Sequence, residues 1–439
     1  MAHFGVLCPP LPGHINPMAA LARELERRGH RTTFVGFADM ERRLPAGLAF
    51  QPFGEADWPT GSLEPYLGRL SRLGSPLSLL RLIRDLAAFA DTICSTLPAA
   101  LDRTPVDGLV IDQTDAAASL VAKALGIPFV NVANALPLNI EEAVPPPVLS
   151  WPYDPSEKGI RRNRGGYRVA RWIERPITRV IRRHAARLGR RDVRFADDAW
   201  SEIAQLTQCV RGLDFPRRQL PTSFHYLGPF REAEPALAID LPDDGRPLVF
   251  CSLGTLQGSR ANTFRAVAEA VAPTGAHLLI AHGGMLSPSD IASLPGRPIV
   301  HDFVPQRAVL RRSALAITHC GFNTVLDALA AGVPMVALPI AFEQPATAAR
   351  LERVGAGIAL HRRRSARRVR SAIETVLGDQ AYRASAGRLA QEIARSGGAT
   401  RAADLIARAL GGGVPPEGAT TARAARDDAR DDSRNGSSS

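Results

Sequence analysis

The sequence predicts an α/β protein with two Rossmann-like domains that face each other across a cleft. Two observations indicate this fold. The chain has 439 residues, which is longer than a single hydrophobic core usually organises. An alternating rhythm of apolar strands and amphipathic helices, typical of a parallel sheet, occurs twice: up to about residue 135, and again from Pro247 onwards.

A segment with linker composition separates the two rhythms. Residues 229–246 are rich in proline, glycine and charged side chains, which favour an irregular connection. We therefore expect one domain over residues 1–228 and a second over residues 247–410. Residues 411–439 are rich in Gly, Pro, Ser and charge, and predict a disordered tail.

The first elements of the chain place a histidine at a ligand-binding edge. Phe4–Cys8 predicts a strand, Ile15–Arg28 an amphipathic helix ending at Gly29, and residues 32–35 a second strand. His14 therefore lies beyond the carboxyl end of the first strand, where open α/β sheets bind ligands. Imidazole there suits a general base, because its unperturbed pKa is near neutrality. A structural or solvated histidine is the alternative.

A carboxylate behind His14 would fix its tautomer and stabilise the imidazolium. Asp112 is the candidate, because it ends the apolar strand Leu109–Ile111 and precedes a helix predicted over Ala116–Leu125. Asp115 is the competitor, although it can instead cap that helix. We prefer Asp112.

A second ligand-binding turn is expected in the second domain. Leu315–Thr318 predicts a buried strand and Asn323–Ala330 the helix that follows it. The free N–H groups and the dipole of a helix start attract anions. The turn could also supply side-chain hydrogen-bond donors from His319, Asn323 and Thr324, and a bare backbone at Gly321. Asp327, about one helical turn later, offers a carboxylate that could accept hydrogen bonds from hydroxyl groups. The alternative is an ordinary connection with Asn323 and Thr324 as helix caps.

With the flanking segments His301–Gln306 and Pro339–Gln344, this turn resembles the nucleotide-sugar signature of the UDP-dependent glycosyltransferases of small lipophilic acceptors. The resemblance implies the following set of contacts: Phe303, Val304 and Gln306 at the base and ribose; His319, Gly321, Asn323 and Thr324 at the diphosphate; Asp327 at the ribose; Glu343 and Gln344 at the sugar. In the same family, Gly-His-x-x-Pro carries the general base, and residues 13–17 match it.

Some positions are less specific. The resemblance assigns Thr255 to the diphosphate, but a plain turn after a strand explains Ser252–Thr255 equally well. The plant enzymes usually have Trp at Phe303, Glu at Asp327 and Asp at Glu343. These conservative departures leave the identity of the sugar open.

Missing motifs exclude other classes. No Gly-x-Gly-x-x-Gly follows a strand and no Gly-Lys-Ser/Thr loop occurs, which counts against dinucleotide dehydrogenases and phosphate-loop nucleotidases. Because no Asp-x-Asp pair marks a metal-bound sugar nucleotide, we expect neither a metal nor another cofactor. UDP-glucose would be the donor substrate, and the helix dipole, His319 and hydroxyl groups would stabilise the departing UDP.

The formal net charge is +11, and arginine is concentrated between Arg161 and Arg194. Apolar residues recur among these arginines with helical periodicity, which predicts an amphipathic helix. A solvated helix face and contact with a membrane surface are both open interpretations. Nucleic acid is the least favoured partner.

The five cysteines are scattered without metal-ligand spacing, and no signal peptide is recognisable. The longest apolar run, Ala328–Phe342, is too short to span a bilayer. We expect a cytoplasmic protein, with peripheral contact at the inner membrane left open.

The resemblance extends from Ala2 to about Leu410 and is closest to the bacterial zeaxanthin glucosyltransferases. It implies the glycosyltransferase B-type fold, with the acceptor bound by the first domain and the donor by the second. It also implies inverting transfer of glucose from UDP-glucose to the hydroxyl of zeaxanthin. The alternatives are a macrolide, a sterol or another lipophilic acceptor, a sugar-nucleotide epimerase, and a non-catalytic binder.

Overall fold

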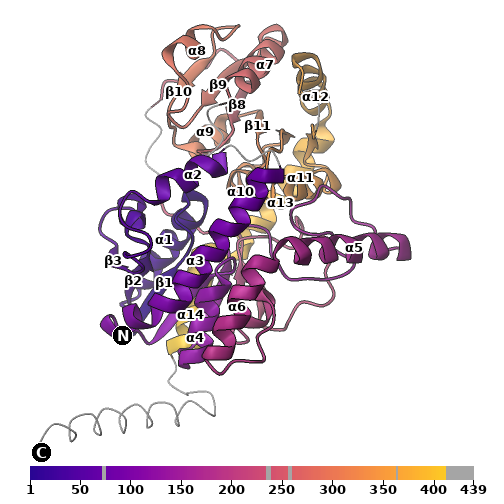
Figure 1. The fold of residues 1–439 in the computed structure, drawn as a ribbon. Coiled ribbons are helices and arrows are strands. Elements are labelled where there is room, and N and C mark those ends of the chain that lie inside the picture. Colours follow the sequence, from indigo (N-terminus) through magenta and orange to yellow (C-terminus); the bar gives the residue numbers. More distant parts are fainter. Residues whose placement is uncertain (72–75, 234–238, 256–259, 362–363, 412–439) are drawn as a thin grey trace, which may run out of the picture.

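The computed structural model contains two parallel sheets, one in each half of the chain (Figure 1). It describes residues 1–71, 76–233, 239–255, 260–361 and 364–411. Part of the predicted linker and nearly all of the predicted tail lie outside these ranges. The two parallel sheets confirm the predicted α/β class, and they lie within the two residue ranges proposed for the domains.

The strands of the first sheet have the order β3-β2-β1-β4-β5-β6-β7. β4 and β5 are buried along their whole length, which explains why they are continuous apolar runs. The strands are β1 (His3–Leu7), β2 (Arg31–Gly36), β3 (Ala49–Pro52), β4 (Gly108–Asp112), β5 (Phe129–Ala133), β6 (Gln205–Thr207) and β7 (Phe224–Tyr226).

Helices cover both faces of this sheet (Figure 1). The helices in this half of the chain are α1 (Pro12–Arg27), α2 (Leu63–Ser71), α3 (Pro76–Arg103), α4 (Ala116–Leu125), α5 (Glu157–Ile173) and α6 (Arg175–Arg187), with the short 3-10 turns η1 (Ala38–Arg43) and η2 (Ala196–Ala199).

The second sheet has the order β10-β9-β8-β11-β12-β13. Its strands are β8 (Leu248–Ser252), β9 (His277–Ala281), β10 (Ile299–His301), β11 (Leu315–Thr318), β12 (Met335–Ala337) and β13 (Gly357–Ala359). The remaining elements are α7 (Ala261–Val271), η3 (Ala272–Thr274), α8 (Pro288–Ala292), α9 (Gln306–Arg312), α10 (Phe322–Ala330), α11 (Gln344–Arg353), α12 (Ala366–Gly378), α13 (Gln380–Ser396) and α14 (Gly398–Gly411).

The strand order creates one switch point in each sheet. β1 pairs with both β2 and β4, and β8 pairs with both β9 and β11, so the strand order reverses direction at β1 and at β8. The register Leu7↔Ile111 places the loops after β1 and β4 side by side, and Ser252↔Thr318 does the same after β8 and β11. Ligands bind in the crevice outside such strand ends, so the fold itself selects these four loops.

Three elements differ from the sequence predictions. α1 begins at Pro12, because proline is well suited to the first helical position, and His14 therefore lies in its first turn. The single helix predicted over residues 161–194 is two helices that meet at Glu174, two residues before Pro176. Finally, α14 was expected in the second domain, but its buried residues join the core of the first.

The return of α14 has a clear physical cause. Its apolar face, Ala402, Ala403, Ile406 and Leu410, packs with α1, β1 and β4 in one buried cluster. This last helix packs beside α1, in the half of the molecule that holds the first sheet (Figure 1). The chain therefore crosses between the domains twice.

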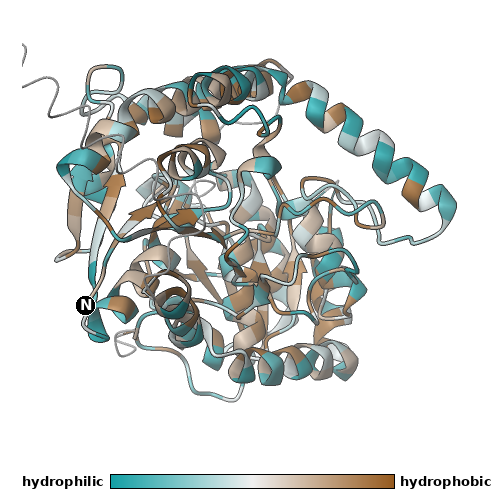
Figure 2. Ribbon diagram, turned by 90° about the horizontal axis from the view of Figure 1, so that it is seen from below, coloured by the Kyte–Doolittle hydropathy of each residue, from teal (hydrophilic) through white to brown (hydrophobic). Residues whose placement is uncertain are grey.

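Figure 2 shows apolar strands enclosed by helices, with α5 as a mostly hydrophilic rod that projects from the body. All five cysteines are buried and unbridged. Within the described ranges, no helix combines the length and the apolar character needed to cross a membrane.

Candidate active site

The carboxyl ends of both sheets open onto one shared cavity of about 660 Å³. The first domain contributes the start of α1 and the loop after β5, and the second domain contributes the loops after β8, β10, β11 and β12. The cavity is lined by His14 and by every residue predicted to bind the donor: Thr255, Phe303, Val304, Gln306, His319, Gly321, Asn323, Thr324, Asp327, Glu343 and Gln344.

His14 and Asp112 form a hydrogen-bonded pair on the first-domain side. Nδ1 of His14 lies 2.7 Å from Oδ2 of Asp112, whose side chain is fully buried. Since a carboxylate can only accept, Nδ1 carries the proton and Nε2 is the nitrogen available to a ligand in the cavity. Asp112 is itself held by Thr114, through N–H and Oγ1, and by Nδ2 of Asn134 at 2.7 Å.

Burial and mutual attraction act in opposite directions on this pair. Burial would lower the pKa of His14, but the charge and hydrogen bond of Asp112 outweigh it, and the pKa of His14 is raised. Burial would likewise raise the pKa of Asp112, but His14, Thr114 and Asn134 together hold it below its usual value. Asp112 is therefore an anion that stabilises the protonated imidazole.

Asp115, the competing partner, occupies the N-cap position of α4 and is not hydrogen-bonded to His14. Burial and the negative charge of Asp112 raise its pKa to about 7. The position beside His14 thus belongs to Asp112, as the sequence analysis preferred.

The turn after β11 packs the ring of His319 against two bare backbones. A Cβ on Gly321 would lie 2.3 Å from Nε2 of His319, and one on Gly254 would lie 2.8 Å from the same atom. Both positions therefore require glycine. Burial lowers the pKa of His319 to about 4, so the ring is neutral at pH 7 and can donate one N–H. Cys320, between His319 and Gly321, has φ +67°, a strained conformation of the kind found at ligand sites.

The start of α10 is left without a side-chain cap. Gly321 is its N-cap residue, so Asn323 and Thr324 do not serve as the caps that the sequence left open. Asn323 instead donates from Nδ2 to the carbonyl of Gly13, at 2.7 Å, across the cavity from the first domain. Its Oδ1 is buried without a partner. The uncapped N–H groups face the cavity as an anion site.

Asp327 and Gln306 form the floor of the expected ribose subsite. Nε2 of Gln306 donates to Oδ2 of Asp327 at 2.8 Å, and Nε of Arg231 donates to Oδ1 at 2.6 Å. Nearby, the Phe303 side chain is 68% exposed, an unusual state for a large aromatic ring and one suited to stacking on a base. Arg231 also donates to Gln208, at 2.7 Å, and so connects this subsite to the first domain.

Glu343 and Gln344 begin α11 on the opposite wall. Oε1 of Gln344 accepts from the N–H groups of Ile340 and Ala341, at 2.8 and 2.9 Å, and this shapes the turn before the helix. Phe342 has φ +56°, a second strained residue at the cavity. Burial raises the pKa of Glu343, whose charge in turn raises that of His14. Glu343 on this wall and His14, the candidate base, therefore interact electrostatically.

Comparison with known proteins assigns this site to a family. The family model described as UDP-glucoronosyl and UDP-glucosyl transferase matches residues 167–393. A zeaxanthin glucosyltransferase of Pseudescherichia vulneris is 38% identical over 416 residues, which cover 94% of this chain and 99% of that protein. The chain belongs to the UDP-glycosyltransferase family. It is an enzyme that transfers glycosyl groups.

Further relatives support the assignment. A zeaxanthin glucosyltransferase of Pantoea ananas is 35% identical over 421 residues, covering 94% of this glycosyltransferase and 97% of that protein. Two solved structures share the fold: the kitacinnamycin glycotransferase, with TM-score 0.73, 23% identity and coverage of 93% and 99%, and the calicheamicin glycosyltransferase CalG4, with 0.71, 24%, and 94% and 100%. The protein therefore has the glycosyltransferase B-type fold.

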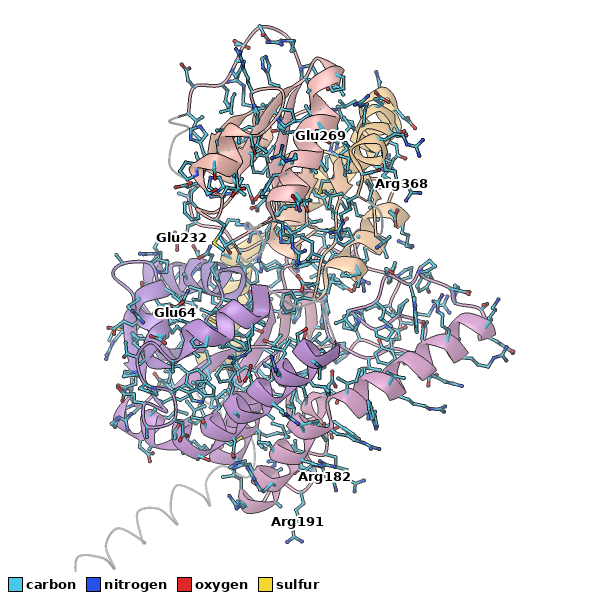
Figure 3. The ribbon with its side chains drawn as sticks, turned by 45° about the horizontal axis from the view of Figure 1, so that its top comes forward. Glu64, Arg182, Arg191, Glu232, Glu269 and Arg368 are labelled. Atoms are coloured by element: carbon cyan, nitrogen blue, oxygen red, sulfur yellow. The ribbon has the colours of Figure 1, made fainter. Side chains whose placement is uncertain are left out.

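Several cavity residues of the glycosyltransferase were missed from its sequence, among them Arg231, Asn134 and Glu232. Arg231 lies in the predicted linker, and nothing local marks it as a site residue. Asn134 directly follows β5, so the rule that strand ends face ligands would have found it. Glu232, which Figure 3 shows between the two domains, also lines the cavity.

The family implies a nucleotide-sugar donor and an acceptor substrate for this enzyme. Among the residues described, no three His, Cys, Asp or Glu side chains gather in a way that could hold a metal ion. The charge that the turn after β11 offers to a diphosphate comes from backbone N–H groups and the α10 dipole.

Proposed function

We propose that this glycosyltransferase moves glucose from UDP-glucose to a hydroxyl group of zeaxanthin, with inversion at the anomeric carbon. The observation that carries the proposal is the His14–Asp112 pair, which faces the donor subsite across the same cavity. A base in this position has a task only if an acceptor hydroxyl is activated there.

The donor assignment rests on the second-domain wall. Phe303 would stack on uracil, with Val304 and Gln306 beside it, and Asp327 would accept hydrogen bonds from the ribose. The diphosphate would meet the uncapped start of α10 together with His319 and Thr255. Glu343 and Gln344 would hold hydroxyl groups of the glucose, since carboxylates and amides match sugar hydroxyls.

The reaction would proceed in one displacement. Nε2 of His14 takes the proton of the acceptor hydroxyl while the oxygen attacks the anomeric carbon from the face opposite UDP. The bond from that carbon to the β-phosphate oxygen breaks, and UDP leaves as the anion. Asp112 stabilises the imidazolium until its proton passes to water. The helix start, rather than a metal, would offset the charge of the departing diphosphate, because its N–H groups are already oriented.

The acceptor assignment rests on the two relatives named as zeaxanthin glucosyltransferases, which match almost the whole chain. Zeaxanthin is a long apolar diol, and only its end would enter the cavity. Since such a molecule dissolves in the bilayer, we also propose that this enzyme of the cytoplasm meets its acceptor at the membrane surface.

One assay separates this proposal from its rivals. The purified protein is incubated with UDP-glucose, with and without zeaxanthin, and UDP and carotenoid glucosides are measured by chromatography. We expect UDP release only with the carotenoid, and a β-linked glucoside by NMR. Appearance of UDP-galactose without acceptor would indicate an epimerase, and UDP-glucose binding without turnover would indicate a binder. Turnover with macrolides or sterols but not zeaxanthin would overturn the acceptor assignment.

A further inference from the structure

Each of the two arginine-rich helices has an outer face that is exposed to solvent. On α5, Asn163 and Tyr167 face inward: Nδ2 of Asn163 donates to the carbonyl of Glu142 at 2.9 Å, and the hydroxyl of Tyr167 to that of Val144 at 3.0 Å. Residues half a turn away, at positions 161, 165, 168 and 172, therefore face outward. The Trp172 side chain is 61% exposed there, beside Val169 at 58%.

α6 also has a solvent-facing side. Ile181, His184 and Ala185 are buried against α3 and α4, so the opposite side of α6 faces solvent. Arg168 and Trp172 are four residues apart on α5, and Arg175, Arg179 and Arg182 follow at spacings of four and three on α6, so each group lies on one side of its own helix. We name this set the basic stripe: Arg168, Trp172, Arg175, Arg179 and Arg182.

The arginines of the basic stripe differ from their neighbours in having no acidic partner within the described chain. Arg164 pairs with Glu142 at 2.6 Å, and Arg183 pairs with Asp91. These pairs neutralise the sides of the two helices. The four stripe arginines are exposed and unneutralised, and Figure 3 shows Arg182 and Arg191 pointing away from the body.

We propose that the basic stripe docks on a bilayer surface that contains anionic phospholipids. Exposed arginines supply the charge complementarity, and tryptophan is the side chain that favours the boundary between headgroups and acyl chains. Trp172 lies among the arginines of the basic stripe, and a helix face that contacts only water would gain no stability from an exposed tryptophan. This inference rests on the proposed function in one respect: the lipophilic acceptor gives membrane docking a purpose. The structural evidence for docking does not depend on that acceptor.

The docked helix is connected to the cavity. The loop between β5 and α5 leaves the cavity wall at Asn134 and Ala135, and the hydrogen bonds from Asn163 and Tyr167 fasten it to the inner face of α5. The loop of residues 134–156 thus joins α5 to the cavity wall beside His14.

The test is cosedimentation of the full chain with vesicles of phosphatidylcholine alone or mixed with phosphatidylglycerol. We compare the wild type with Arg168→Gln/Arg175→Gln/Arg179→Gln/Arg182→Gln. A matched control removes four exposed arginines elsewhere: Arg31→Gln/Arg367→Gln/Arg395→Gln/Arg408→Gln. Both variants lose the same charge, so only position distinguishes them.

We expect the wild type to bind mixed vesicles, and to bind less to neutral vesicles and at 1 M salt, where the Debye length is about 3 Å. Each arginine near an anionic surface contributes roughly fivefold in partitioning, so the stripe variant should bind about 100-fold more weakly or worse. The control should stay close to wild type. Trp172→Ala should weaken binding to both kinds of vesicle.

Equal binding of the two fourfold variants, or of neutral and mixed vesicles, would overturn the proposal. Retention of duplex DNA by the wild type and not by the stripe variant, without vesicle binding, would assign the stripe to nucleic acid and overturn it too. The assay contains neither UDP-glucose nor acceptor, so its failure and a failure of the proposed transfer activity are distinguishable. Circular dichroism and UDP binding check that each variant is folded.

Discussion

His14 and Asp112 show how two buried groups can each be kept in the useful protonation state. Burial disfavours both charges, yet each pKa moves in the direction set by the partner. The raised pKa of His14 means that its neutral, proton-accepting form disappears as the pH falls through that pKa. The activity of the wild type should therefore fall as the pH is lowered, and the midpoint of this acid limb of the pH profile should lie above the ordinary pKa of histidine.

Asp112→Asn tests this relation. Removing the negative charge lowers the pKa of His14, so the acid limb of the rate against pH should move to lower pH. At the same time the maximal rate should fall by roughly 100-fold or more, because the amide no longer stabilises the imidazolium or fixes the tautomer. The measurement is the pH profile of kcat/KM for glucosyl transfer. A purely structural Asp112 would lower the rate without moving the limb.

The sequence predicted residues whose positions follow from a local rule. Asp112 ends a recognisable buried strand, and His14 and His319 lie beyond the ends of two others, where a parallel sheet faces its ligands. Arg231 could not be found in this way. Its role depends on Gln208 and Asp327, which are brought to it from two different domains.

At the scale of elements, the sequence predicted strands and helices correctly where an apolar run or an apolar helical period was complete. The helix predicted over Ala116–Leu125 has the bounds of α4, and the strand predicted over Leu315–Thr318 has those of β11. The break between α5 and α6 was missed, although Pro176 signals it, because the apolar period continues through the joint. The destination of α14 was missed for a different reason. Its apolar face fits either domain, and only tertiary packing decides between them.

The packing of α14 gives a stability prediction. Ile406 is fully buried among α1, β1 and β4, so Ile406→Ala should lower the free energy of unfolding of the first domain by about 2–5 kcal/mol. The check is denaturant unfolding followed by tryptophan fluorescence. Arg408→Ala, an exposed position on the same helix, is the control and should change little. A loss for Ile406→Ala as small as that of the control would contradict the assignment of α14 to the first-domain core.

At the scale of the molecule, the two domains are joined by polar contacts at the cavity and by a buried ion cluster behind it. Asp214 of the first domain accepts from Nε of Arg350 in α11, at 2.9 Å, and from Nε of Arg217, at 2.7 Å. Burial alone would raise the pKa of Asp214, but the two guanidinium groups lower it to about 2. Removing one partner of such a cluster leaves buried charge uncompensated, so the cluster favours one arrangement of the domains.

In this arrangement the two domains contribute different groups to the cavity. The second domain presents the uncapped start of α10 and the neutral His319, while the first presents His14 on its buried carboxylate. Asn323 and Gly13 join the two sides at 2.7 Å. The account therefore requires that donor binding and acceptor activation be separable by mutation.

His14→Ala is the most direct test of that claim. UDP binding, measured by calorimetry, should remain close to that of the wild type, because the donor contacts lie in the second domain. Glucosyl transfer should fall by about 100-fold or more, the usual contribution of a positioned base. His361→Ala, a histidine outside the cavity, serves as the control and should retain both properties. Transfer near the wild-type rate in a folded His14→Ala protein would contradict the account.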